Sequence, residues 1–548
     1  MAGATRTPLI REDASRPEAV AGLAIAVAVA LIAVGIASLF GLVGIDATLG
    51  GGSGMTAIGG VTTVTALGGL LVALGAAVIG LGVGSALGYV ETEPSPNAGL
   101  VATVAFAGVW FVLGGLAASV AFDGVLAWLP AGAATGGAAF VTAAATREDV
   151  GSTLPAGAVA VVIGGTFLTG TIGPSWVWDL GFEQQASLTA TFVVPAATIG
   201  CGLLAGWAAA KAYGGFGARG RRMGAYLLIY VNASAIIGVL FLLIAFTAVR
   251  GIPGLLTGAT VAPGAGPTVS VLGVSVALPV SVPFVMNGVS LLNDFQGVLP
   301  AIVGTVWLVV GAVVFAVPLG VGAAVFLTEY AERGRLTQAV EIATNGLWST
   351  PSIVFGLFGF TFLVPRFGGT KSLLSGMLTL GFMLLPLVLI TSREALLAVP
   401  DEYRDASAAL GVSKWHTIRS VVVPAALPGV VTGVILGVGR IAGETAPILL
   451  TMTGGTFVSG DRAADVIGGF AFTAQPPFVT NPELLRATTA LPFQLYALIT
   501  AGVGLGDNVS NPTEFQWATA FVLLLVVLSF YAVGIGARYY FRRRLRHE

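Results

Sequence analysis

Residues 401–424 read DEYRDASAALGVSKWHTIRSVVVP and lie between two strongly apolar runs. These runs, residues 372–392 and 425–452, are each long enough to cross the hydrocarbon core of a bilayer. Gly411 suits the positive φ that often ends a helix. The stretch is therefore predicted to form a short helix, a turn and a second short helix that joins two membrane spans.

The composition extends this prediction to the rest of the chain. Of the 548 residues, 56% are hydrophobic and only 9% are charged, whereas a soluble globular chain carries roughly 25% charged residues. Because so few polar side chains cannot cover a water-facing surface, we expect lipid to surround much of the protein. The net charge of −1 provides no basic field that would attract nucleic acid. The expected location is the cell membrane, with many passes.

Apolar runs of spanning length occur in both halves of the chain. The first six cover residues 19–43, 57–89, 99–121, 124–145, 156–173 and 186–210, and six more cover residues 225–249, 300–328, 342–365, 372–392, 425–452 and 514–537. Short polar segments, such as residues 147–149, separate the early runs. The predicted fold class is all-α, a polytopic transmembrane helical bundle of about 12 spans, six N-terminal extra spans and a six-span core.

Basic residues indicate the orientation. One group precedes the second set of runs and another ends the chain: Lys211, Arg219, Arg221, Arg222, Arg542, Arg543, Arg544 and Arg546. Loops rich in Lys and Arg stay on the cytoplasmic side. Six spans between the two groups place both on that side, and six spans before the first group place the N-terminus there as well. Both termini are therefore predicted to be cytoplasmic.

One apolar run carries two charges. Arg440 lies roughly 22 Å along a helix that starts near residue 425, beyond the middle of the hydrocarbon core. A charge at that depth is costly and is expected to face a pore or a partner. Glu444, four residues on, is predicted on the same helix face, and Pro447 predicts irregular backbone just beyond. Either the two charges only neutralise each other, or Arg440 lines the path of an anion and Glu444 tempers its attraction.

Residues that would indicate an enzyme are scarce. Cys201 is the only cysteine, and His416 and His547 are the only histidines, so a thiolate cluster or a histidine metal site is not expected. The chain also lacks the P-loop sequence that binds nucleotide phosphates. We expect no catalytic residue, no bound metal and no cofactor. A membrane-embedded enzyme would need more ionisable groups in its spans than Arg440 and Glu444.

The spacing within the quoted stretch resembles the EAA loop of ABC importer permeases. The matching positions are Asp405-Ala406-Ser407, then Gly411, then Val421, Val423 and Pro424, with Asp, Ser and Val replacing the more usual Glu, Ala, Ile and Leu. The resemblance implies an ABC importer permease domain over residues 215–548. It also implies that residues 394–424 are the coupling loop, which docks on an ATPase subunit. The alternative is an ordinary helical hairpin on the membrane surface.

The sequence RIAGETAP at residues 440–447 is similar to the signature of the PstA family of phosphate-importer permeases, and the resemblance extends over about residues 220–548. It implies a path for inorganic phosphate past Arg440, Glu444 and Thr445. The implied partners are a PstC-like second permease, a PstB-like ATPase dimer that hydrolyses the ATP, and a PstS-like extracytoplasmic phosphate-binding protein. The alternatives are an ABC importer permease for another solute, such as molybdate or sulfate, and the sister PstC family.

Residues 1–214 have no counterpart in that family, and they form a predicted N-terminal extra transmembrane region of unknown role. Its runs are rich in Gly and Ala and contain almost no internal charge. This composition favours a structural part, such as a lipid-facing helical layer or a scaffold, over a transport path. A regulatory module is the remaining interpretation.

Overall fold

The computed structural model divides the chain into two compact units, residues 1–242 and 243–548, and the boundary falls inside one long helix, α7 (Gly217–Leu256). The structure describes residues 16–45, 62–90, 92–122, 125–179, 187–264, 266, 268–271, 274–277, 279–288, 297–332, 334–453, 463–476, 478–500 and 512–545.

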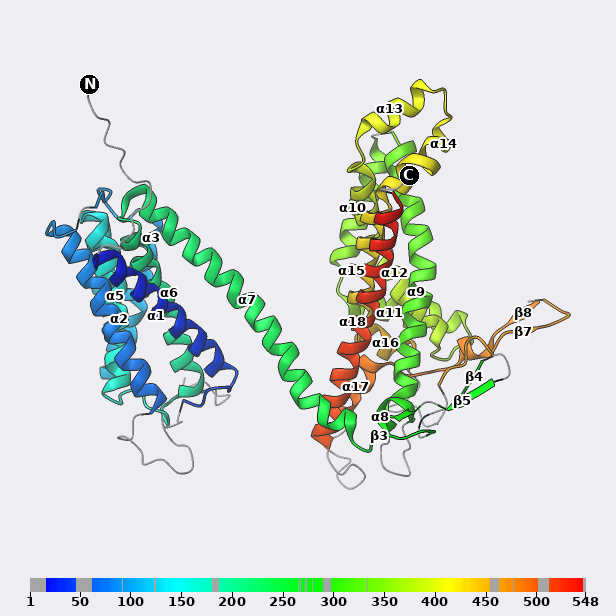
Figure 1. Cartoon of the computed structure of the whole chain (residues 1–548), viewed down its shortest axis with the longest axis horizontal. Helices are drawn as coiled ribbons and strands as arrows, with labels where there is room; N and C mark the ends of the chain where they lie inside the picture. The colour runs from blue at the N-terminus through cyan, green and yellow to red at the C-terminus, as the bar shows by residue number, and fades with distance from the viewer. Residues whose placement is uncertain are drawn as a thin grey trace, which may run out of the picture. The chain divides into compact units, whose positions relative to one another are not determined.

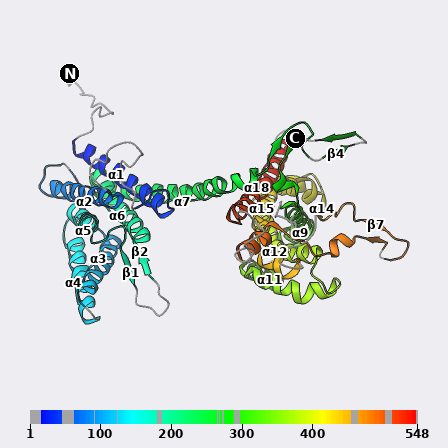
Figure 2. The ribbon, with the colours of Figure 1, turned by 90° about the horizontal axis from the view of Figure 1, so that it is seen from below.

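The first unit is a bundle of helices that run between its two ends (Figure 1). Its helices are α1 (Arg16–Leu39), α2 (Thr63–Ala86), α3 (Leu100–Ala121), α4 (Val125–Ala145), α5 (Glu148–Leu168), α6 (Ala190–Tyr213) and the first part of α7. Two short antiparallel strands, β1 (Val177–Asp179) and β2 (Ser187–Thr189), connect α5 to α6. Figure 2 shows the α3–α4 pair alongside the other helices of this unit.

Glycines allow a close helix contact in the first unit, between α2 and α5. Gly68, Gly75 and Gly82 recur every seven residues of α2, which keeps them on one face of the helix. A methyl group on Gly75 would overlap the carbonyl oxygen of Gly157, and one on Gly68 would lie 2.8 Å from that of Gly164. In a bilayer no hydrophobic force brings helices together, so close packing of small residues must do it.

The second unit contains the remaining helices. They are the rest of α7, then α8 (Pro283–Met286), α9 (Leu299–Val325), α10 (Arg335–Ser349), α11 (Ser352–Phe358), α12 (Leu373–Leu397), α13 (Asp401–Ala409), α14 (Lys414–Thr417), α15 (Val423–Ala442), α16 (Ala446–Thr451), α17 (Leu491–Thr500) and α18 (Pro512–Leu545). Three antiparallel strand pairs lie in its connecting segments: β3 (Thr260–Val261) with β6 (Val280–Ser281), β4 (Thr268–Val271) with β5 (Val274–Ala277), and β7 (Ala471–Phe472) with β8 (Val479–Thr480).

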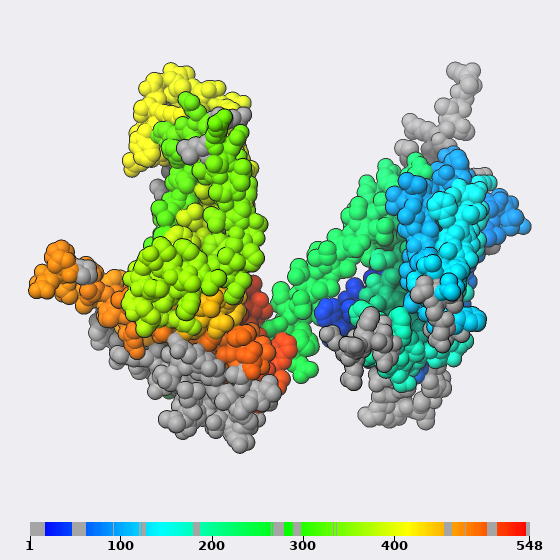
Figure 3. Space-filling view, turned by 180° about the vertical axis from the view of Figure 1, so that it is seen from behind, coloured from blue at the N-terminus to red at the C-terminus, as the bar shows by residue number. Residues whose placement is uncertain are grey.

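The core of the second unit forms where α9, α12, α15 and α16 meet, with Leu308, Leu380 and Leu384 among its fully buried side chains. α18 packs on α15, where the Tyr531 hydroxyl lies against Gly439. Figure 1 shows α13, α14 and the C-terminal end of α18 at one end of this unit, and α8, α17 and β3 at the opposite end. Figure 3 shows the α13–α14 region, in yellow, projecting from its end of the unit.

The number of spans differs slightly from the expected twelve. Among the described residues, ten helices are long and apolar enough to cross a membrane, or up to eleven if one bent pair counts as a single span. The bent pair is α10 with α11, whose axes differ by 103° at a break next to Pro351. The 21-residue α4 lies outside the ten; it contains Pro130 and is rich in Ala, Gly and Thr. The all-helical membrane fold itself is confirmed.

Candidate functional site

The charged run predicted from residues 425–452 forms two helices separated by a break. α15 ends at Ala442, residues 443–445 are not helical, and α16 starts at Ala446 with Pro447 in its first turn. The expected irregular backbone is therefore present just before the proline. The expectation that Arg440 and Glu444 share one helix face is wrong, because the helix ends between them and Glu444 lies in the break.

Arg440 lies in the last turn of α15 and is exposed in this single chain. Its guanidinium Cζ lies 5.6 Å from the ring centroid of Trp348 on α10, a cation–π contact. Arg440 and Glu444 form no ion pair with each other among the described residues. Glu444 and Thr445 are both half-buried. The structure thus places the three predicted path residues at one helix break. The positive charge, that of Arg440, is exposed at the surface of the chain.

A second broken helix packs against the first. Gly356 of α11 lies against Ala446 and Pro447 of α16, and its missing side chain allows the approach. Lys371 Nζ donates a hydrogen bond to the Leu449 carbonyl oxygen at 2.8 Å. Transporters commonly build substrate sites from discontinuous helices, since their free backbone groups are available there. The α10–α11 and α15–α16 breaks together make such an arrangement beside Arg440.

The helical hairpin, residues 401–417, has the form that its sequence predicts. α13 and α14 are joined by a turn in which Gly411 has φ of +72°. Asp405 and Ala406 are exposed, whereas Ser407 is buried. Pro424 lies in the first turn of α15, as expected for the start of the next span.

Exposed apolar side chains on the hairpin are a feature that the sequence reasoning missed. Leu410 is 82% exposed and Trp415 is 59% exposed, and Tyr403 also faces outward. These exposed side chains are available to pack against another protein, although single exposed apolar residues are also common on protein surfaces. Their place next to Asp405 and Gly411 could have been noted from the spacing alone.

A half-buried contact behind the hairpin was also missed. The Arg404 guanidinium lies 2.8 Å from the Glu329 carboxylate, which follows α9 in a π-helical turn, residues 326–330. The hydrogen bond with Glu329 raises the pKa of Arg404 above its ordinary value. The sequence gives no signal for this pair, because the two residues are separated by 75 positions.

The first unit contains a buried charged network at the ends of α5 and α6, in segments that lie between the predicted spans. Glu148 and Asp149, expected in a polar separator, are fully buried at the start of α5. Lys211, grouped in the sequence with the basic residues that indicate the cytoplasmic side, is buried as well and lies 2.6 Å from Glu148. Ser85 Oγ donates to Asp149 Oδ2 at 2.9 Å. The two carboxylates are tolerated because a helix N-terminus favours negative charge and Lys211 neutralises one of them.

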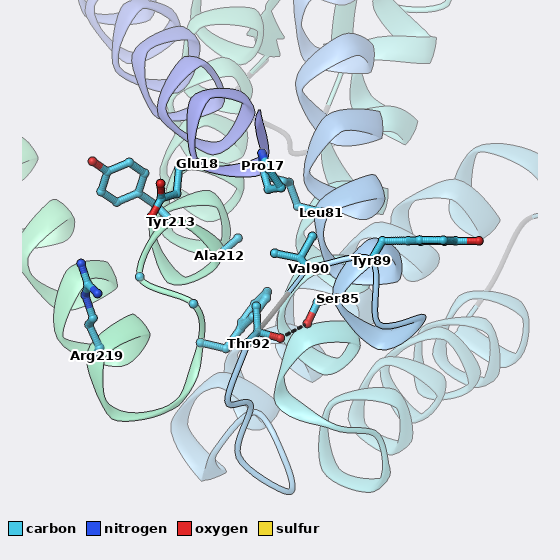
Figure 4. Close-up of a pocket in the computed structure, with 13 residues that line it drawn as sticks. Pro17, Glu18, Leu81, Ser85, Tyr89, Val90, Thr92, Ala212, Tyr213 and Arg219 are labelled. Carbon is cyan, nitrogen blue, oxygen red and sulfur yellow. Dashed lines mark hydrogen bonds between the residues drawn. The ribbon is translucent and has the colours of Figure 1, made fainter. Parts of the chain in front are cut away.

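A pocket of about 380 Å³ lies beside this network. Figure 4 shows Glu18, Thr92, Tyr213 and Arg219 around it, and the hydrogen bond between the hydroxyls of Ser85 and Thr92. Ser85 therefore connects the pocket wall to the buried Asp149. Sequence reasoning did not place these residues together, since they come from four separate segments.

Comparison with known proteins identifies the class of protein. Residues 316–547 match the family described as binding-protein-dependent transport system inner membrane component, a region that begins inside α9 and runs past the end of α18. It contains the helical hairpin and both broken helices. The chain belongs to this family of ABC importer permeases, which are transport subunits and not themselves catalytic.

Within the family the chain is of the PstA type. The phosphate transport system permease protein PstA of Xylella fastidiosa (strain Temecula1) is 31% identical over 242 residues, 44% of this chain and 74% of that protein. PstA of Haemophilus influenzae is 34% identical over 255 residues, 46% of this chain and 78% of that protein. The probable ABC transporter permease protein YqgI of Bacillus subtilis is 41% identical over 135 residues, 25% of this chain and less than half of that protein, 46%.

A solved structure of the MetNI methionine ABC transporter, in inward-facing conformations, is also similar. The identity is 18% and the TM-score 0.32, over 44% of this chain and 94% of that chain. This likeness is too weak to assign a substrate. The membrane permease predicted from the sequence is confirmed by the family and by the apolar helices.

Proposed function

We propose that this chain is the permease subunit of an ATP-driven phosphate importer. It forms the translocation path together with a second, PstC-like permease subunit. A PstB-like ATPase dimer binds on the cytoplasmic side and hydrolyses ATP, and a PstS-like extracytoplasmic protein delivers inorganic phosphate. The names of the PstA relatives support phosphate as the substrate.

The observation that carries the proposal is the place of Arg440. It is an exposed arginine at a break between two helices, without an ion-pair partner among the described residues. An arginine at membrane depth is costly unless it faces water or a partner. A guanidinium can bind a phosphate through two parallel hydrogen bonds. Arg440 is therefore suited to attract phosphate into the path.

Glu444 and Thr445 lie in the same break, and they modify how strongly Arg440 holds an anion. The Glu444 carboxylate repels a phosphate close to Arg440, so the anion is attracted without being trapped. The Thr445 hydroxyl can donate a hydrogen bond to a phosphate oxygen. The proposal favours this division of roles over the interpretation in which the two charges only neutralise each other. It is supported by the lack of an ion pair between Arg440 and Glu444 among the described residues.

The helical hairpin is proposed as the coupling element. Asp405, Ala406 and Gly411 present a small, exposed surface that fits a cleft on the ATPase, and Leu410 and Trp415 add apolar contact area. Residues 215–548 then form the permease domain and residues 1–214 an added membrane region. The hairpin and the basic end of α18 lie at one end of the second unit, which supports a cytoplasmic C-terminus (Figure 1).

The test is uptake of labelled phosphate in cells that lack their own importer and express this chain with its partner subunits. Replacing Arg440→Ala should lower uptake by at least about tenfold, because a charge-assisted contact to the anion is lost. Arg250→Ala is the matched control, since Arg250 also lies 5.6 Å from an aromatic ring, that of Phe246.

Two outcomes would contradict the proposal. Uptake at the normal rate in the Arg440→Ala variant would show that Arg440 does not line the phosphate path. Uptake of sulfate or molybdate instead of phosphate by the unchanged complex would favour an importer for another solute. Membrane abundance of each variant, measured on the same samples, separates loss of transport from loss of protein.

A further inference from the structure

Arg404 connects the helical hairpin to the ends of two spans. Its Nη2 donates to Glu329 Oε1 at 2.8 Å and to the Leu396 carbonyl oxygen at 3.1 Å. Its Nη1 donates to the Val399 carbonyl oxygen at 2.8 Å and to Asp401 Oδ1 at 3.1 Å. One guanidinium therefore holds the end of α9, the end of α12 and the start of α13 together.

The π-helical turn after α9, residues 326–330, is the part of α9 that receives these contacts. Glu329 binds Arg404 of α13, and the neighbouring Tyr330 ring lies 5.2 Å from Lys414 Nζ of α14. Both helices of the hairpin thus contact the same turn. π-helical turns are rare, and those that occur are frequently found at functional sites.

Apolar packing supports the same junction from inside the unit. Ala324 of α9, Leu396 of α12 and Val422, just before α15, belong to one small buried cluster at the base of the hairpin, and Val399 completes the contact. The ends of three helices therefore meet under the hairpin. A force on the hairpin reaches all three through buried atoms, while Arg404 adds the polar link to α9 and α12.

We propose that the Arg404–Glu329 pair is a brace that makes the hairpin and the adjoining ends of α9 and α12 move as one body. Arg404 is a positioning residue for energy coupling and touches neither substrate nor nucleotide. The inference rests on the proposed function, because it takes the hairpin as the element that the ATPase moves. Without the brace, the hairpin follows the ATPase while the spans lag behind, and ATP is hydrolysed without transport.

The geometry requires arginine at this position. Five donated hydrogen bonds diverge from one planar group to four acceptor residues. Lysine has a single ammonium group with three donors, so it cannot replace the planar guanidinium, which donates in several fixed directions. A conservative Arg404→Lys change therefore keeps the charge but loses the brace.

The experiment compares ATP hydrolysed with phosphate transported by the complete complex in proteoliposomes. We expect the Arg404→Ala and Glu329→Gln variants to raise the ATP used per phosphate by roughly tenfold, as the loss of a charge-assisted pair implies. Arg404→Lys should lie between these variants and the unchanged protein. The double variant should be no worse than either single variant, since the two residues act as a unit.

Arg393→Ala is the matched control, because Arg393 forms an ion pair of 2.6 Å with Glu341 and also lies near the end of α12. Its ATP use per phosphate should stay within about twofold of the unchanged protein. An unchanged ratio of ATP hydrolysed to phosphate transported in Arg404→Ala would overturn the brace, whether or not both rates fall. If the unchanged complex transports no phosphate at all, the proposed function fails instead, and ATP hydrolysis and co-purification of the ATPase still report on the hairpin.

Discussion

Lys211 Nζ lies 2.6 Å from Glu148 Oε1 inside the first unit, with both side chains withdrawn from solvent. Lys211 also donates to Ser152 Oγ at 2.8 Å. The other Glu148 oxygen accepts the backbone N–H groups of Ser95 and Gly217, each at 3.0 Å. One ion pair therefore joins α5, α6, the start of α7 and the segment before α3, so the first unit depends on a charge pair as well as on apolar packing.

Breaking this pair should destabilise the first unit strongly. Glu148→Gln leaves the buried Lys211 without a carboxylate, and Lys211→Met leaves the buried Glu148 with only the half-exposed Arg221 at 3.6 Å, so each should cost about 3–5 kcal/mol. The double variant should recover much of the loss, since no charge then remains unpaired. Thermal unfolding of the purified protein in detergent measures the effect. Arg147→Ala is the control, because Arg147 is half-exposed beside Asp149 and should cost less than about 1 kcal/mol; equal losses for Arg147→Ala and Lys211→Met would contradict the prediction.

The glycine contact between α2 and α5 should not tolerate an added methyl group. Gly75→Ala would place its Cβ against the Gly157 carbonyl oxygen and push the helices apart, at a cost of about 1–3 kcal/mol. Gly80→Ala is the control on the same helix, since nothing lies within 4 Å of its added Cβ. Its effect should be neutral or slightly stabilising, by up to about 1 kcal/mol. Similar melting temperatures for the two variants would show that the helices are not held at this distance.

The turn of the helical hairpin should depend on Gly411. Its φ of +72° disfavours a residue with a Cβ atom, so Gly411→Ala should cost about 1–2 kcal/mol within the hairpin. Gly411→Asn should be milder, because asparagine adopts this conformation more readily. Hydrogen exchange over residues 401–417 measures the local effect. Gly346→Ala in α10 is a control without positive φ or close neighbours, and exchange as fast in this control as in Gly411→Ala would argue against the turn.

The brace at Arg404 should be independent of pH in the range where transport is measured. The hydrogen bond with Glu329 raises the pKa of Arg404, so its contribution is complete below the ordinary arginine value and is lost only above the raised one. Hydrogen exchange of the hairpin should therefore be unaffected by titration of Arg404 from about pH 6 to pH 9. An Arg404→His variant should instead show protection below about pH 6.5 that is lost above it. The same pH dependence in both proteins would show that another group controls the hairpin.

Much of the second unit follows from local sequence signals. The apolar runs at residues 300–328 and 372–392 became α9 and α12, and Gly411 adopts the expected turn. The break next to Pro351 was not predicted, since residues 342–365 were expected to form one span. The break before Pro447 was predicted, because proline lacks the N–H that a helix interior needs. Such features depend on a few consecutive residues, and the chain therefore determines them without its tertiary structure.

The candidate site was predicted less completely. Arg440 and Glu444 were selected because charge is costly in an apolar run, and Thr445 because residues 440–447 resemble the PstA signature. The structure places all three at one helix break. The expected shared helix face failed, since α15 ends at Ala442. The Trp348 contact of Arg440 could not be predicted, because it depends on how α10 packs beside α15.

The sequence alone determined that this chain is a membrane protein. It also determined the approximate positions of most helices and of the helical hairpin between two of them. Hydrophobicity and backbone preferences are local, and they act before any packing. Only the tertiary structure decided which charges meet: Lys211 with Glu148 across 63 positions and Arg404 with Glu329 across 75. A charge in an apolar bundle must have a partner. Which partner it has depends on which helices pack together, and no local sequence pattern specifies a contact between residues so far apart in the chain.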